Sequence, residues 1–341
     1  MRIGKLLCLA LGLLFTLPAM VAADAFRDDH PEEYTVVQGD TLWDISGRFL
    51  RSPWYWPEIW HVNPEIDNPH LIYPGDVIRL VYVDGEPRLT VERDLREVRL
   101  APGIREEVLP EAIDTIPMEA IQPFLNRSHV VDASFFDTAP YVVAGEDERV
   151  MASRGDLIYV RRLPSENGSS GYTLVRRGGA YRDPDTREVL GYEATYLGEL
   201  NITRDGDPAS GRVTTSNREV LAGDYLLRAP REPIRTRFVP RAPATEVDGR
   251  IIDVLDGVSQ IGQFDVVVLD RGDDNGMEVG DVLAVYQAGR TVRDPETREQ
   301  VTLPAERAGE LIVFRTFERV SYGLVMRASR HMNVLDTVRN P

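Results

Sequence analysis

The chain has 341 residues, 43% of them hydrophobic, which is enough apolar sequence for about two domains with folded cores. This composition excludes a chain that is disordered or of low complexity throughout. Lys and Arg number 39 against 55 Asp and Glu, so the formal net charge is −16. A protein this acidic offers no overall attraction to DNA or RNA phosphates, and we expect no nucleic-acid partner.

The N-terminus has the three parts of a secretory signal peptide. Arg2 and Lys5 precede an apolar run over residues 6–17, and small residues follow it. The run is too short for a membrane-spanning helix, so we expect no transmembrane segment in the mature chain. Cleavage after Ala23 or after Ala25 fits the pattern equally, and the signal peptide is assigned to residues 1–23.

Cysteine usage limits the chemistry of the mature protein. The single cysteine, Cys8, lies within the apolar run of the signal peptide. Loss of this segment excludes disulfides, thiolate metal sites and a cysteine nucleophile. Together with export, this predicts a periplasmic protein.

Residues 33–83 form a compact pattern of strand, helix, helix and strand. An alternating, β-branched stretch over 33–38 predicts a strand, and Gly39-Asp40 predicts a turn. Thr41 and Asp44 have the spacing of a capping box at the start of a helix. Pro57 is suited to the first position of a second helix, and the turn after it leads into a second strand over 77–82.

The same residues resemble a LysM module. The resemblance covers residues 33–83 and rests on these anchor positions: Tyr34, Val36, Gly39, Asp40, Thr41, Leu42, Ile45, Asn63, Ile72, Pro74, Gly75, Asp76 and Ile78. It implies binding to N-acetylglucosamine-containing glycans, in this setting peptidoglycan, without a cofactor. The sugar of that family lies in a shallow groove between the loop after the first strand and the loop before the second. The glycan-binding residues implied here are Gly39, Asp40, Thr41, Leu42, Asn63, Pro64, Glu65, Ile66 and Ile72.

These residues also have structural interpretations. Gly39, Thr41 and Leu42 suit a turn, a cap and a core position, and Asn63 suits a helix end. All four tryptophans lie between Trp43 and Trp60. They suit sugar stacking, but packing of the small core is the favoured interpretation.

Residues 86–127 look like a connector. Charge-rich strands or extended chain over 89–100 precede two short helix-like pieces, 106–116 and 118–125, which prolines interrupt.

The sequence from residue 130 onward has a β pattern with an internal repeat. Residues 182–188 (RDPDTRE) recur as 293–299 (RDPETRE) at an offset of 111, and further matches follow at offsets of 111 and 112. Residues 154–160 also resemble 279–285. We interpret this region as two copies of one small all-β, barrel-like domain, residues 130–230 and 246–341, joined by an Arg/Pro linker over 229–245. The predicted fold class is thus an α+β module followed by two duplicated β domains.

The sequence shows no catalytic constellation. The five histidines are scattered, without a pair at metal-ligand spacing. Residues 270–276 resemble a calcium loop loosely, and a solvated hairpin is the favoured interpretation. We expect no catalytic residue, no metal and no enzyme activity. A LysM-targeted peptidoglycan-processing enzyme is the alternative.

The arrangement of the whole chain is similar to the type IV pilus secretin-associated LysM proteins (TsaP family). The C-terminal part resembles the C-terminal domain of the flagellar assembly protein T. This resemblance implies a non-enzymatic periplasmic anchor, which holds peptidoglycan at one end and an outer-membrane secretin at the other. A flagellar or general envelope scaffold is the alternative within the binding class.

Overall fold

The computed structural model describes residues 25–60, 71–93, 112–164, 171–228, 238–255, 260–289 and 291–341, apart from the side chains of 126–128 and 148. The chain divides into two compact units, residues 1–115 and 116–341, so the division falls inside the predicted connector. The predicted signal peptide and most of the Arg/Pro linker lie outside the described residues. Each unit is considered by itself.

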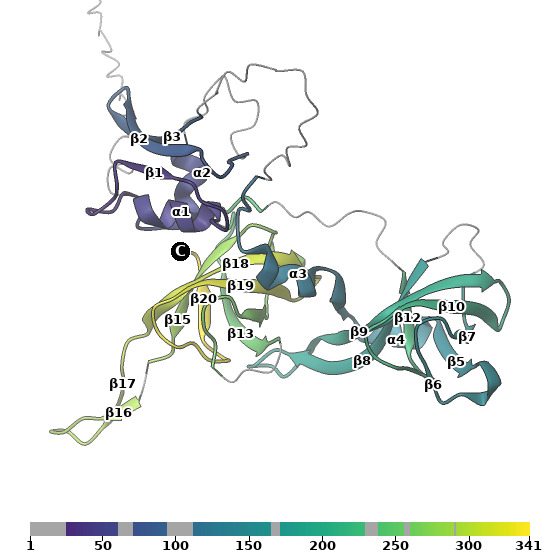
Figure 1. Ribbon diagram of the computed structural model, residues 1–341. Coiled ribbons are helices and arrows are strands. Elements are labelled where there is room, and N and C mark those ends of the chain that lie inside the picture. The colour runs from purple at the N-terminus through teal and green to yellow at the C-terminus, as the bar shows by residue number, and fades with distance from the viewer. Residues whose placement is uncertain are drawn as a thin grey trace, which may run out of the picture. The chain divides into compact units, whose positions relative to one another are not determined.

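The first unit packs two short helices against a three-stranded sheet. Its elements are β1 (Glu33–Thr35), α1 (Leu42–Phe49), the 3₁₀ turn Pro53–Tyr55, α2 (Trp56–Ile59), β2 (Val77–Val83) and β3 (Glu86–Glu92). The sheet is antiparallel with the order β1-β2-β3 (Figure 1). The predicted order of elements is therefore correct as far as β2.

The sheet continues beyond the predicted end of the module at residue 83. Asp84 and Gly85 turn the chain at positive φ, and β3 then pairs with the whole of β2. Leu89 and Val91 of β3 are buried in the core with Trp56 and Trp60. The core interpretation of these two tryptophans is confirmed. β3 overlaps the start of the stretch 89–100, for which the sequence predicts strands or extended chain, but its pairing with β2 in the sheet of the module was not predicted.

The second unit is mostly β. Its first part comprises α3 (Met118–Arg127), β4 (Ser128–Val131), α4 (Ala133–Thr138), β5 (Tyr141–Gly145), β6 (Met151–Ala152), β7 (Leu157–Arg161), β8 (Gly171–Arg182), β9 (Val189–Arg204), β10 (Ala209–Ser216), β11 (Val220–Leu221) and β12 (Tyr225–Arg228). Six strands pair in a ring with the order β5-β7-β10-β9-β8-β12, and β12 pairs back to β5.

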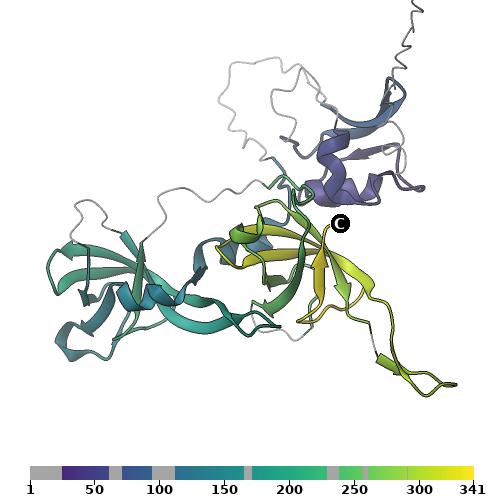
Figure 2. The ribbon, with the colours of Figure 1, turned by 180° about the vertical axis from the view of Figure 1, so that it is seen from behind.

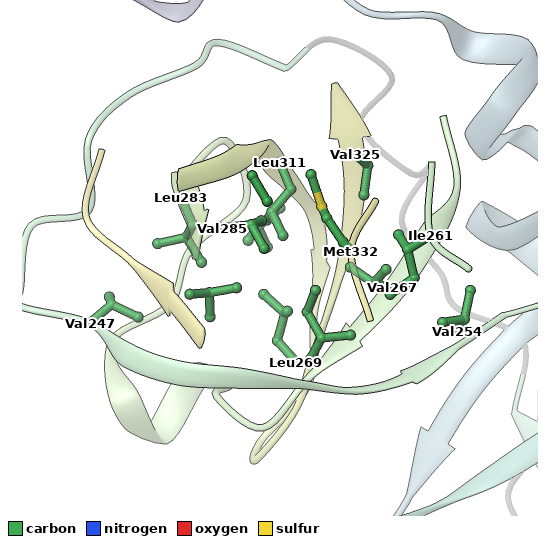
Figure 3. Packing of buried hydrophobic residues seen from close by; sticks show 14 of the residues in the cluster. Val247, Val254, Ile261, Val267, Leu269, Leu283, Val285, Leu311, Val325 and Met332 are labelled. Atoms are coloured by element: carbon green, nitrogen blue, oxygen red, sulfur yellow. The ribbon is translucent and has the colours of Figure 1, made fainter. Parts of the chain in front are cut away.

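The second part of this unit contains a closed six-stranded barrel. Its elements are β13 (Asp248–Val254), β14 (Val266–Leu269), β15 (Val282–Gln287), β16 (Thr291–Arg293), β17 (Gln300–Thr302), β18 (Glu306–Thr316), β19 (Ser321–Ala328) and β20 (Thr337–Arg339). The ring order is β13-β14-β19-β18-β15-β20. The barrel interior is filled by aliphatic side chains, including Leu269, Leu283 and Leu311 (Figure 3). The hairpin of β16 and β17 lies outside the ring (Figure 2).

One type of turn recurs at the strand ends. A residue with positive φ precedes an aspartate, and the aspartate Oδ2 accepts a hydrogen bond from the backbone N–H three residues earlier. It occurs at Asp76, Asp156, Asp224, Asp265, Asp281 and Asp336. An αL residue followed by a short acceptor suits such a turn.

The turn at Asp156 brackets Val213 by two backbone hydrogen bonds, and the turns at Asp265 and Asp281 bracket Val325 and Val313 in the same way, so this turn does not decide which segment residues 154–160 match. One local prediction for this region is wrong. Residues 270–276 do not form a hairpin, because β14 pairs with β13 and β19 and not with β15. The Gly-Asp turn is common to many strand ends here and so gives no unique alignment.

Candidate functional site

The loop between β1 and α1 is held by the Asp40 carboxylate. Asp40 Oδ2 accepts hydrogen bonds from the Tyr34 hydroxyl (3.0 Å) and from the Val37 backbone N–H (2.9 Å). Gly39 has φ +93, and a Cβ there would meet nothing within 4 Å. The glycine is therefore required by the backbone conformation, and the space beside it is open.

Thr41 and Leu42 fix the start of α1. The Asp44 backbone N–H donates to Thr41 Oγ1 (3.1 Å), and Thr41 Oγ1 donates to the Asp44 carboxylate (2.8 Å), so Thr41 is the predicted N-cap. The Leu42 side chain is buried in the core. The side chains of both residues are thus used within the fold, which leaves their backbone as the surface that a ligand could contact.

The second predicted loop is described only at its end. Asn63, Pro64, Glu65 and Ile66 lie outside the described residues. Ile72 is fully buried in the core. Arg93 fixes this end of the loop, because its guanidinium binds both Asp76 carboxylate oxygens (2.9 and 2.7 Å) and the Leu71 carbonyl (3.0 Å). The carboxylate of buried Asp76 raises the pKa of Arg93, chiefly through this hydrogen bond.

A segment from the predicted connector bridges the two loops. The Ile113 backbone N–H donates to the Ile72 carbonyl (2.8 Å), while the Leu42 and Trp43 backbone N–H groups donate to the carbonyls of Asp114 (2.9 Å) and Thr115 (3.1 Å). The Ile113 side chain packs against the core. Residues 112–115 therefore lie between the loops as extended chain, and the helix predicted over 106–116 is wrong for its described part.

This bridge occupies the donors that a ligand would use. The first N–H groups of a helix have no partner within the helix and so bind carbonyl groups readily. At α1, the Asp44 N–H is satisfied by the Thr41 cap, and those of Leu42 and Trp43 are satisfied by residues 112–115. An N-acetyl carbonyl would compete with the Asp114 and Thr115 carbonyls for these donors.

A pocket of about 400 Å³ lies elsewhere on the first unit. It is lined by Trp60, Val83, Asp84, Glu86 and Arg88. The Arg88 guanidinium donates to the Glu58 carbonyl (2.7 Å) and pairs with Glu86 (2.6 Å). These contacts fix the wall of the pocket. None of its residues was singled out from the sequence except Trp60, because the pocket depends on the pairing of β3 with β2 beyond the predicted end of the module.

The described residues show no grouping of His, Cys, Asp or Glu that could hold a metal ion. Within the same residues, no helix combines the length and the apolar character needed to cross a bilayer.

Comparison with known proteins places the first unit in a family. Residues 34–81 match the LysM domain model. A 60-residue stretch, 15% of the chain, is 38% identical to the uncharacterized protein YqbP of Bacillus subtilis (strain 168). The match spans only 27% of that protein's length. The matched residues include the capped start of α1, both loops and β2, and residues 34–81 are therefore a LysM domain, a binding module and not a catalytic one.

Proposed function

We propose that the protein binds N-acetylglucosamine-containing glycans of peptidoglycan through its LysM domain. The observation that carries this proposal is the LysM match over residues 34–81. Its support is the open space beside Gly39 in the loop between β1 and α1. The backbone donors of Leu42 and Trp43 are bound by residues 112–115, so a sugar would have to compete for them. An N-acetyl group needs an apolar niche with backbone hydrogen-bonding partners, which loops provide.

The second unit is proposed to contain two copies of one six-stranded domain. The rings β5-β7-β10-β9-β8-β12 and β13-β14-β19-β18-β15-β20 match strand by strand in chain order. Glycines recur with the same surroundings. A Cβ at Gly198 or Gly309 would collide with a backbone carbonyl, of Thr215 and Arg327 respectively, and a Cβ at Gly211 or Gly323 would collide with a leucine.

From these parts we infer a non-enzymatic tether of the cell envelope. One end binds glycan, and the duplicated β domains, whose described residues contain no group that could hold a metal ion, suit protein binding. The signal-peptide pattern supports a periplasmic location, at the cell wall and the outer membrane. The resemblance to type IV pilus secretin-associated proteins supports an outer-membrane secretin as partner.

Binding of defined sugars by the purified mature chain tests the glycan proposal. Isothermal titration with a β-1,4-linked N-acetylglucosamine hexamer is expected to show binding. Titration with a β-1,4-linked glucose hexamer is the control, because it has a hydroxyl in place of each 2-acetamido group. Equal binding of both sugars, or of neither, would contradict the proposal.

The secretin and enzyme alternatives need separate experiments. The immobilised mature chain is expected to retain the purified, detergent-solubilised secretin. If the secretin is not retained, the protein is not a secretin anchor. In murein gel zymography the expected result is no clearing. A clearing band would replace the tether by the peptidoglycan-processing enzyme.

A further inference from the structure

The two repeated heptapeptides fold in the same way. The first tip, residues 182–188, joins β8 to β9, and the second tip, residues 293–299, joins β16 to β17. Asp183 Oδ1 accepts hydrogen bonds from the backbone N–H groups two and three residues later (2.9 and 2.7 Å), and Asp294 Oδ1 does the same (2.8 and 3.0 Å). Arg187 and Arg298 both have φ +65. The two tips thus present their side chains on the same local scaffold.

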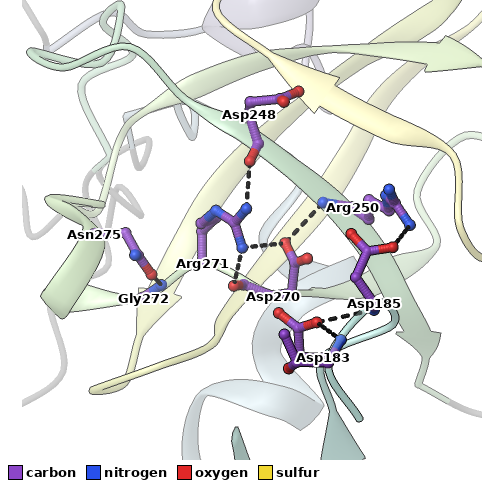
Figure 4. A network of polar contacts seen from close by, with 9 residues as sticks. Asp183, Asp185, Asp248, Arg250, Asp270, Arg271, Gly272 and Asn275 are labelled. Atoms are coloured by element: carbon purple, nitrogen blue, oxygen red, sulfur yellow. Dashed lines mark hydrogen bonds and ion pairs between the residues drawn. The ribbon is translucent and has the colours of Figure 1, made fainter. Parts of the chain in front are cut away.

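The first tip is docked on the barrel that follows it. Arg250 Nη1 on β13 binds Asp185 Oδ1 (3.0 Å), as Figure 4 shows. Arg319 Nη1, in the turn between β18 and β19, binds Glu188 Oε1 (2.9 Å) and the Val189 carbonyl (3.1 Å). A pair of arginines therefore receives the two carboxylates of the tip.

A buried tyrosine accompanies these ion pairs. Exposed ion pairs contribute little to stability, so they alone would hold the tip weakly. Tyr181, at the base of the first tip, is buried, and its hydroxyl lies close to that of the fully buried Tyr322 of β19. The docked arm thus combines two paired carboxylates with a buried aromatic side chain.

The second tip carries the same groups without a receptor. Glu296 and Glu299 stand at the positions of Asp185 and Glu188, and neither forms an ion pair within the described part of the chain. All residues of β16 and β17 are exposed. Three large aliphatic side chains are exposed beside this tip: Val292 (39%), Val301 (42%) and Leu303 (40%).

Val292 stands at the position of Tyr181, the residue that anchors the docked arm. Exposed aliphatic side chains on a hairpin with unpaired carboxylates are typical of a surface that a partner covers.

We propose that residues 291–303 are a docking arm for a partner protein whose surface presents two arginines beside an apolar niche. The chemistry of the receptor is taken from this chain, in which Arg250, Arg319 and Tyr322 receive the equivalent arm. Two guanidinium groups complement Glu296 and Glu299, and the niche accepts Val292 with its neighbours. This assignment places the protein-binding end of the molecule on the second barrel and does not depend on glycan binding.

The chain itself supplies the probe for this proposal. In an acceptor chain, the substitutions Asp185→Arg and Glu188→Arg release the first tip from Arg250 and Arg319. The same acceptor chain also carries Glu296→Arg and Glu299→Arg, so that its own second tip cannot bind another acceptor. Wild-type chain, with its free second tip, is the donor, and association is measured by analytical ultracentrifugation.

A one-to-one complex is expected when acceptor and donor are mixed. The substitutions Glu296→Arg and Glu299→Arg in the donor are expected to weaken this complex at least tenfold. The substitutions Arg250→Glu and Arg319→Glu in the acceptor are expected to have the same effect. The control donor Asp205→Arg/Glu246→Arg has the same charge change at exposed sites and is expected to bind normally. Two results would overturn the proposal: association that is unchanged by the tip substitutions, or no association at about 100 µM. A dissociation constant of this size corresponds to a binding free energy of about −5.5 kcal/mol.

Two further measurements keep this test decisive. Circular dichroism checks that the acceptor is folded. If the acceptor with Asp185→Arg and Glu188→Arg is unfolded, an acceptor with the milder substitutions Asp185→Ala and Glu188→Ala is used instead. Self-association of unmodified chain through the second tip would overturn the choice of a different protein as partner. The glycan titration is independent of every outcome here.

Discussion

The backbone N–H of Leu42 donates a hydrogen bond to the Asp114 carbonyl at 2.9 Å. This bond links the first turn of α1 to a segment beyond the matched LysM residues 34–81. The neighbouring bonds of Trp43 to Thr115 and of Ile113 to Ile72 make the link continuous across both loops. The LysM domain of this chain is therefore bridged by its own backbone at the place where the family resemblance puts the glycan.

Weakening this bridge is expected to increase glycan binding. Ile113→Pro removes the N–H that binds the Ile72 carbonyl, and a hydrogen bond contributes about 0.5–1.5 kcal/mol net. The affinity for the N-acetylglucosamine hexamer should rise about two- to tenfold. Ala112→Pro, which leaves the Ile113 N–H in place, is the matched control. Unchanged or weaker binding by folded Ile113→Pro would mean that the bridge does not compete with the sugar.

A side chain at Gly39 is expected to obstruct the groove. Gly39→Gln places a side chain in the open space beside residue 39, and we expect at least a fivefold loss of affinity for the hexamer. Gly85→Gln is the control, because Gly85 also has positive φ (+86) and open surroundings, in the β2–β3 turn. Both changes should cost about 1–2 kcal/mol of stability from backbone strain. Equal affinities in the two folded variants would remove Gly39 from the site.

Arg315 is expected to stabilise the second unit strongly. Its guanidinium is partly buried, donates to the carbonyls of Phe124 (3.1 Å) and Leu125 (2.8 Å), and contacts His129 Nδ1 (2.8 Å). Because hydrogen bonds of charged groups contribute about 1.5–3 kcal/mol, Arg315→Met should lower the free energy of unfolding by about 2–4 kcal/mol in urea denaturation. Arg330→Met removes only an exposed ion pair with Glu306. A similar loss in both variants would contradict this role.

The two tips should respond to pH in the same direction. Hydrogen bonds from backbone N–H groups lower the pKa values of Asp183 and Asp294. Their charged forms therefore favour the folded loops above the ordinary aspartate pKa of about 3.9, and this contribution is lost as the pH falls through the lowered values. NMR titration of the Thr186 and Thr297 amide signals should show midpoints below that value. Midpoints at or above it would contradict the loop geometry.

Local signals in the sequence predicted much of the first unit. Thr41 caps α1, Pro57 lies in the first turn of α2, and Gly75-Asp76 forms the turn into β2. Each of these features depends on residues close in the chain, for which capping and turn preferences are strong.

Features that depend on distant partners could not be predicted in this way. The helix-like pattern before residue 116 gave no sign that residues 112–115 would be held extended by backbone bonds to Ile72, Leu42 and Trp43. Residues 89–92 alternate between apolar and polar side chains, but the pairing of β3 with β2 joins segments that the sequence does not show to be neighbours. Among the predicted glycan residues, Gly39 and Asp40 lie in the loop, whereas Leu42 and Ile72 are buried, because the family motif also contains residues that build the core.

Co-sedimentation with isolated peptidoglycan sacculi tests the central claim most directly. The mature full-length chain and its Ile113→Pro variant are each centrifuged with sacculi, with and without excess N-acetylglucosamine hexamer. Glycan anchoring through the LysM domain predicts that both proteins pellet, the variant more completely, and that the hexamer releases them. If both folded proteins stayed in the supernatant, or if the hexamer released neither, the LysM domain would not be the wall anchor of this protein.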